Sequence, residues 1–112
     1  MVAAILRQVV RREDVESERA VLLNALREHI GRALQEGRFS FADHFCDKLL
    51  AEDPRNLEGW LVKGHLAWRQ FGSPETALAC FRRVLILGEF ESSNEYVAQA
   101  RSSLSRLLAQ LS

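Results

Sequence analysis

The sequence predicts an all-α fold, on the evidence of its apolar spacing and of where proline and glycine occur. Apolar residues recur three and four positions apart along most of the 112 residues, and no stretch alternates apolar and polar residues as a half-buried strand does. Both prolines, Pro54 and Pro74, stand where a helix is expected to begin. Three glycines stand where helices are expected to end: Gly37, Gly72 and Gly88.

Length and composition fit one small soluble domain that covers residues 1–112. Hydrophobic residues make up 47% of the chain and charged residues 27%, which is typical of a folded protein rather than a disordered one. Fifteen Lys and Arg balance fifteen Asp and Glu. Because nucleic-acid-binding proteins usually carry a basic excess, this balance argues against a nucleic acid as partner.

Residues 1–20 are predicted to form an N-terminal helix. Its first half carries one apolar stripe: Val2, Ile5, Leu6, Val9 and Val10. The run is too short to span a membrane, and Arg7 and the lack of a small-residue cleavage site argue against a signal peptide. Mixed charges in residues 11–19 favour continued helix, with Asp14 the expected place of any kink. The stripe is expected either to cover the first helix pair of its own chain or to dock on a second copy.

Two amphipathic helices are expected between residues 20 and 52. The first has a broad apolar face and ends at Gly37: Val21, Leu22, Leu23, Leu26, Ile30, Ala33 and Leu34. The second has a matching face: Phe41, Ala42, Phe45, Cys46, Leu49 and Leu50. Ser40 and Asp43 have capping-box spacing at its start. It should end before Pro54, because the residue that precedes a proline avoids the α conformation.

The stretch from Asn56 to Leu87 predicts a helical hairpin with a tight turn at residues 71–74. The inner face of its first helix is apolar or small: Trp60, Leu61, Gly64, Ala67, Trp68 and Phe71. The second helix, with Ser73 as N-cap and Pro74 at its first position, has a similar face: Ala77, Leu78, Phe81, Val84, Leu85 and Leu87. A mid-helix glycine costs about 1 kcal/mol relative to alanine. We therefore expect another helix backbone to approach Gly64 closely.

A last amphipathic helix is expected within residues 92–112, with Ser92 and Glu95 at capping-box spacing. Its apolar face is the following: Tyr96, Val97, Ala100, Leu104, Leu107, Leu108 and Leu111.

The chain also repeats itself at a period of 34 to 35 residues. Leu26, Ile30 and Ala33 match Trp60, Gly64 and Ala67 at an offset of 34. Ala42, Cys46 and Leu49 match Ala77, Phe81 and Val84 at an offset of 35. A helix-turn-helix unit that recurs at this period is typical of stacked helical repeats.

On these residues the chain resembles the tetratricopeptide repeat (TPR) family. The resemblance is carried in the second unit by Trp60, Gly64, Ala67, Ala77 and Phe81, and in the first by Leu26, Ala33, Ala42 and Pro54. It covers about residues 23–91 and implies a first repeat at 23–56, a second at 57–91 and a C-terminal capping helix at 92–112. Two departures are Ile30, in place of a small glycine, and Cys46, in place of an aromatic residue.

The resemblance implies a short right-handed solenoid of antiparallel helix-turn-helix repeats, whose concave groove binds a peptide or helix of another protein. The family's groove positions correspond here to Asn24, Arg27, Gly31, Gln35, Glu58, Leu61, His65, Trp68 and Arg69. Such a lining suits a peptide with both apolar and charged side chains. The carboxylate clamp of some family members is not expected, because Gly31 and Val62 occupy two of its asparagine positions.

The leading interpretation is therefore a protein–protein interaction module, an adaptor or chaperone-like scaffold. The alternative is a self-assembling structural element, or a homodimer that uses the N-terminal apolar helix. No catalytic residues, metal site or cofactor are expected, because the chain has no recognisable nucleophile set or phosphate loop and its three histidines fall on different helices. Cys46 and Cys80 are expected to be buried thiols, which favours a cytoplasmic location. No membrane partner is expected.

Overall fold

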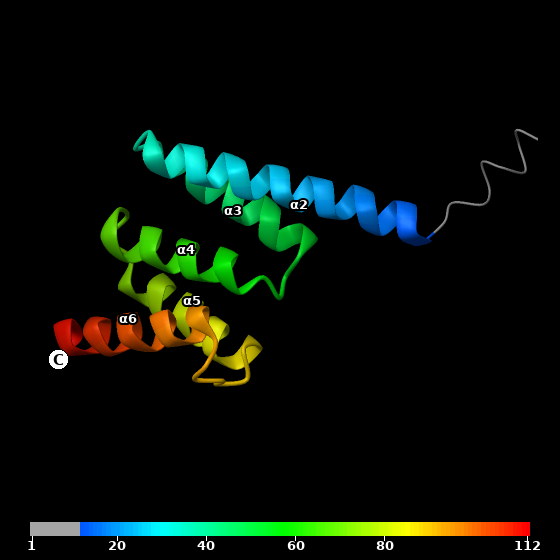
Figure 1. Cartoon of the computed structure of the whole chain (residues 1–112). Helices are drawn as coiled ribbons and strands as arrows, with labels where there is room; N and C mark the ends of the chain where they lie inside the picture. Colours follow the sequence, from blue (N-terminus) through cyan, green and yellow to red (C-terminus); the bar gives the residue numbers. More distant parts are fainter. Residues whose placement is uncertain (1–11) are drawn as a thin grey trace, which may run out of the picture.

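The computed structural model describes residues 12–112, which form five α-helices and no strand (Figure 1). The helices are α2 (Arg12–Gln35), α3 (Phe39–Glu52), α4 (Leu57–Arg69), α5 (Pro74–Leu87) and α6 (Glu95–Leu111). The all-α prediction is therefore confirmed. The apolar stripe from Val2 to Val10 lies outside the described residues, so both expectations for it stay predictions. None of the five described helices combines the length and the apolar character that a bilayer span requires.

The helices pack chiefly on their neighbours in the chain. α2 contacts α3, α3 contacts α4, α4 contacts α5 and α5 contacts α6, and one further contact joins α4 to α6. Figure 1 shows α2 and α3 at one end of this arrangement, α5 and α6 at the other, and α4 between them. One core cluster lies on each side of α4, and the helix supplies Leu66 to the first and Leu61 and Ala67 to the second. α4 is therefore buried on both sides, and only a narrow face of it reaches solvent.

α2 runs without a break from Arg12 to Gln35, so there is no kink near Asp14 and no loop between the predicted N-terminal helix and the first repeat. It has 24 residues, whereas α3 has 14. Leu22 lies at the open edge of the seam between α2 and α3, beside Ala51 and Glu52, and Val21 is turned about 140° around α2 from the buried Leu26, so both are exposed. Their prediction as part of a buried face was wrong.

Other apolar residues that were predicted to face inward are also exposed, because they lie at helix ends or at the free edge of a helix. They are Phe41, Phe71, Leu108 and Leu111.

Gly64 of α4 lies directly against α5. A Cβ atom on this glycine would lie 2.7 Å from Cε1 of Phe81 and 3.1 Å from Cβ of Cys80. The prediction that a helix backbone approaches Gly64 was wrong, because the atoms nearest to it belong to the side chains of Phe81 and Cys80. Phe81 itself is fully buried.

Two asparagines cap helices that position the functional face. The side chain of Asn56 accepts a hydrogen bond from the backbone N–H of Gly59 at 2.8 Å. Asn94 accepts from the N–H groups of Tyr96 and Val97 and is the N-cap of α6, a position that the predicted capping box gave to Ser92. These bonds satisfy backbone donors that have no partner within the helix.

The starts of α3 and α5 use no side-chain cap. α3 begins at Phe39, before the predicted capping box, and its N-cap Arg38 makes no capping bond. α5 begins at Pro74 as predicted, but the Ser73 hydroxyl donates to the Thr76 hydroxyl instead of accepting from the backbone.

Candidate functional site

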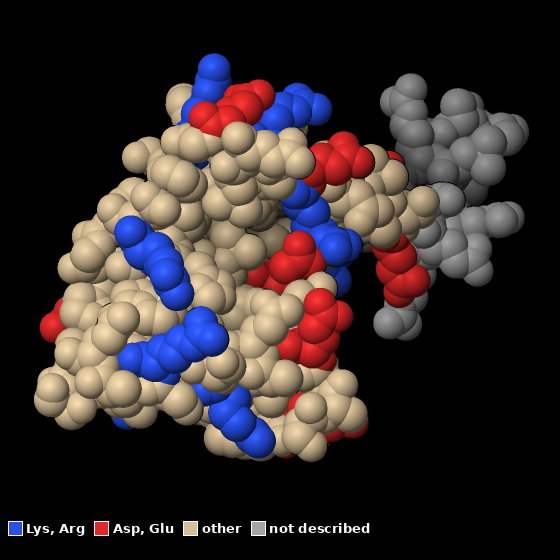
Figure 2. All heavy atoms as spheres, turned by 60° about the vertical axis from the view of Figure 1, so that its left-hand side comes forward, with Lys and Arg blue, Asp and Glu red and all other residues tan. Residues whose placement is uncertain are grey.

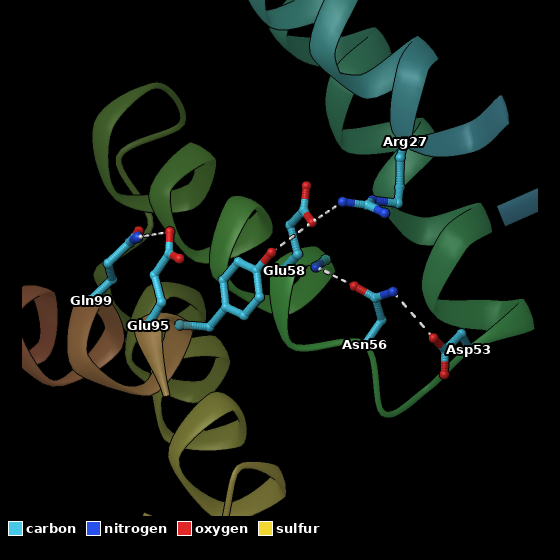
Figure 3. A network of polar contacts seen from close by, with 8 residues as sticks. Arg27, Asp53, Asn56, Glu58, Glu95 and Gln99 are labelled. Atoms are coloured by element: carbon cyan, nitrogen blue, oxygen red, sulfur yellow. Dashed lines mark hydrogen bonds and ion pairs between the residues drawn. The ribbon is translucent and has the colours of Figure 1, made fainter. Parts of the chain in front are cut away.

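Glu58 joins three helices on the face that α2, α4 and α6 share (Figure 3). Its Oε2 accepts a hydrogen bond from Nη2 of Arg27 on α2 at 2.9 Å, and another from the Tyr96 hydroxyl on α6 at 3.1 Å. Burial raises the pKa of the Tyr96 hydroxyl, and its hydrogen bond to the carboxylate raises it further. Arg27 and Glu58 are both partly exposed, so their ion pair contributes less than about 1 kcal/mol. Together with the Tyr96 hydrogen bond, the ion pair links α2, α4 and α6 at this point.

The turn before α4 sets the position of Glu58. Asn56 Nδ2 donates to Asp53 Oδ2 at 3.1 Å while its Oδ1 caps the helix, as Figure 3 shows. Gly59 lies against the side chains of Leu49 and Leu50, and a Cβ there would be 3.0 Å from a Leu50 methyl group. The cap and this close packing fix the first turn of α4, and with it the direction of the Glu58 side chain.

A hollow of about 320 Å³ lies nearer the other end of α4, against the C-terminal part of α2 and the first residue of α3. Its lining is mostly apolar, with polar groups from α4 and the turn that follows it: Leu34, Phe39, Val62, His65, Leu66, Arg69 and Gln70. Figure 2 shows the molecule from the side of the α2 C-terminus and the chain's C-terminus. In this view several Lys and Arg side chains lie on the left, and a group of Asp and Glu lies right of centre.

His65 lines this hollow, and its ring is held by neighbouring aromatic groups. The ring centroid is 6.4 Å from that of Trp68 and 5.1 Å from that of Phe81, and Nε2 is 3.5 Å from the Ser103 hydroxyl on α6. Burial lowers the pKa of His65, and the nearby Arg69 guanidinium lowers it further. The lowered pKa favours the neutral imidazole at pH 7. A neutral imidazole donates a hydrogen bond from one ring nitrogen and accepts one at the other, and the tautomer decides which is which.

Arg69 is the exposed cation at the edge of the hollow. Its guanidinium carbon lies 4.3 Å from the centroid of the Trp68 ring, a cation–π contact. Trp68 is itself anchored, because Nε1 donates to Oε1 of Gln110 on α6 at 2.9 Å. Among the described residues no carboxylate forms an ion pair with Arg69. Its charge is thus held in place by an aromatic ring and remains available to an anion.

Apart from Leu61, the predicted groove residues fall into four groups. Arg27 and Glu58 meet in the ion pair, His65 and Arg69 meet at the hollow, and Trp68 lies partly buried between α4 and α6. Asn24, Gly31 and Gln35 are exposed on α2, and Asn24 borders the Arg27–Glu58 pair.

Leu61 does not belong to the groove. It is 5% exposed and packs in the core cluster between α4, α5 and α6, so its placement among the groove residues is corrected. Val62, the next residue, lines the hollow instead. Successive helix residues differ by about 100°, and α6 covers the Leu61 side of α4. Four residues of α4 follow one another at intervals of three or four positions and so form one stripe along the helix: Glu58, Val62, His65 and Arg69. The sequence alone was enough to show this stripe.

The two cysteines are buried free thiols, as predicted. Burial, with the carboxylate of Asp43 adding to it, raises the pKa of Cys46 to about 12, and burial also raises the pKa of Cys80. Neither thiol is therefore a nucleophile at neutral pH. Within residues 12–112, no three side chains of His, Cys, Asp or Glu gather closely enough to bind a metal ion.

Comparison of the chain with protein-family models, with curated proteins and with solved structures found no match.

Proposed function

We propose that the chain is a short TPR-like array that binds an apolar, acidic segment of another protein on the face shared by α2, α4 and α6. In this proposal α2 with α3 and α4 with α5 are the two repeats, stacked as a right-handed solenoid, and α6 is the capping helix. The observation that carries the proposal is the apolar hollow beside α4, with Arg69 at its edge, a cation to which no carboxylate within residues 12–112 is paired.

The packing order supports a repeat array. Each described helix contacts the helix that follows it in the sequence. In addition α4, the first helix of the second unit, contacts α6, which stands where the first helix of a third unit would lie. Ala42 and Ala77, which stand 35 residues apart, are both fully buried. Likewise Ala33 and Ala67, 34 residues apart, are buried to the same extent. Equivalent positions in the two units therefore share one environment.

The chemistry of the hollow favours a partner with apolar and acidic side chains. Leu34, Phe39 and Val62 offer apolar walls to a side chain of leucine or phenylalanine size. Arg69 offers a planar donor group that suits a carboxylate. The Arg27–Glu58 pair is internally neutralised, so it gives the opposite end of the face no net preference for an acidic or a basic residue.

The test is selection of short peptides from a random library on the wild-type protein, followed by affinity measurements on two charge variants. Arg69→Glu reverses the charge at the hollow. Arg82→Glu is the control, because it makes the same change in net charge on α5. Arg82 is exposed and does not line the hollow at Arg69 or the surface around Arg27 and Glu58.

We expect the selected peptides to combine acidic and apolar residues. They should bind Arg69→Glu about tenfold more weakly than the wild type, since like charges would then meet, and bind Arg82→Glu unchanged. Selected peptides without acidic residues, or equal losses in the two variants, would contradict the proposal.

A further inference from the structure

The outer side of the α2–α3 pair is an apolar face that no described residue covers. Asp43 and Asp47 of α3 point toward α4, because both carboxylates pair with Lys63, at 3.0 and 2.7 Å. A step of two residues turns an α-helix by about 200°. Phe41, two residues before Asp43, therefore lies on the opposite side, and it is 56% exposed.

Two hollows follow one another along this face, in the seam between α2 and α3. The first, of about 360 Å³, is lined by Leu22, Leu26, Lys48, Ala51 and Glu52. The second, of about 230 Å³, is lined by His29, Arg32, Ala33, Glu36, Arg38, Phe41 and Phe45. The His29 ring stacks on the Phe45 ring at 5.0 Å between centroids, so an aromatic pair lies in the seam. The two hollows and this pair together are called the outer seam.

One pair of opposite charges is placed symmetrically about Phe45. Arg38, the N-cap of α3, lies seven residues before Phe45, and Glu52, the last residue of α3, lies seven residues after it, which is two helical turns in each direction. If two copies of α3 meet antiparallel about a two-fold axis at Phe45, each Glu52 faces Arg38 of the other copy, and each Lys48 lies beside Phe41 of the other copy. Both residues of the charge pair are exposed, and within the described part of the chain the Arg38 side chain contacts its own surface, the Glu36 carboxylate at 3.3 Å and the Phe41 ring at 6.0 Å.

From this self-complementarity we infer that the outer seam is an interface for a second copy of the chain, with the two α3 helices antiparallel. A two-fold interface brings the same patch of both subunits together, so the pattern must match itself, as the order Arg38, Phe45, Glu52 does. The inferred surface lies on the other side of the α2–α3 pair from α4, so dimer formation leaves the hollow at Arg69 open. The inference is independent of the proposed partner binding.

The test is sedimentation equilibrium of the full chain from about 5 µM to about 0.5 mM, a range suited to a modest interface. We expect the mean mass of the wild type to rise from that of a monomer toward twice that value. Arg38→Glu and Glu52→Arg should each weaken dimerisation about tenfold, because each places like charges opposite one another. The double variant, Arg38→Glu with Glu52→Arg, should recover the wild-type dissociation constant to within about twofold, because both charge pairs are restored in reverse.

A matched pair of variants tests the apolar centre of the interface. Phe41→Glu should remain monomeric, whereas Ile86→Glu, the same kind of change at an exposed site on α5, should dimerise as the wild type does. Far-ultraviolet circular dichroism establishes that each variant keeps its helices. A wild type that stays monomeric at every concentration would overturn the inference. A dimer that neither single charge reversal weakens would also overturn it. The same holds for a dimer that none of these substitutions weakens and that only the removal of residues 1–11 abolishes.

Discussion

The Phe81 ring on α5 occupies the space that a side chain on Gly64 of α4 would need. A methyl group at Gly64 would meet two ring atoms at less than 3.0 Å. Because Phe81 is fully buried, the ring has little room to move away. We expect Gly64→Ala to lower the free energy of unfolding by about 1–3 kcal/mol, despite the better helix propensity of alanine.

A matched control for this change is Gly31→Ala in α2. Gly31 is helical and exposed, and a Cβ there would meet no atom within 4 Å. Only the propensity term remains, so we expect a gain of about 0.5–1 kcal/mol in urea unfolding. Two glycine variants that change stability in the same direction would show that the Phe81 contact is not decisive.

The start of α6 depends on Asn94 rather than on Ser92. Asn94→Ala removes the acceptor for two backbone N–H groups, and we expect it to destabilise the protein by about 1 kcal/mol. Ser92→Ala should be neutral within about 0.5 kcal/mol, since Ser92 is exposed and is not the cap. Thermal or urea unfolding of the two variants decides between these positions, and a larger loss from Ser92→Ala would restore the capping box.

His65 should make stability fall as the solution becomes acidic. Its pKa in the folded protein lies below the ordinary value of 6.5, so below pH 6.5 the unfolded chain binds a proton that the folded chain does not. The free energy of unfolding therefore drops as pH falls from 6.5 toward the folded pKa, and this contribution is absent above pH 7. Urea unfolding at pH 7.5 and pH 5.5 should show a smaller difference in His65→Gln than in the wild type. An unchanged difference would mean that the imidazole keeps its ordinary pKa in the fold.

Both thiols should be protected from reaction in the folded protein. Cys46 and Cys80 are buried, and the pKa of Cys46 is about 12. At pH 8 an aromatic disulfide reagent should therefore react only as fast as the protein opens, and both thiols should react at once in guanidinium chloride. Stoichiometric reaction of the native protein within the mixing time would contradict this burial.

Sequence spacing predicted the helices well because their buried positions recur on one side. Ala42, Ala77 and Phe81 are all fully buried, and each lies where the periodicity put it. The errors concern the edges of the buried faces. Val21 is turned about 140° around α2 from the buried Leu26, and Leu22 lies at the open edge of the seam beside Ala51 and Glu52. How far a neighbouring helix covers the edge of a face is not encoded in the spacing of that face.

The candidate site was predicted in part for the same reason. Glu58, His65 and Arg69 share the exposed stripe of α4, and their spacing alone is enough to group them. Leu61 was placed wrongly because the approach of α6 decides which edge of that stripe is buried. The contacts of Glu58 with Arg27 and Tyr96 join residues that are 31 and 38 positions apart in the sequence, and only the folded chain brings them together.

Chemical-shift mapping tests the central claim most directly, with a selected acidic and apolar peptide titrated into uniformly labelled wild-type protein. If the hollow binds the peptide, the amide signals of Val62, His65 and Arg69 should shift most, with a common saturation curve. Signals of Arg82 and Ile86 on α5 should stay in place. Shifts confined to α5, or saturable binding without any change at the hollow, would contradict the account.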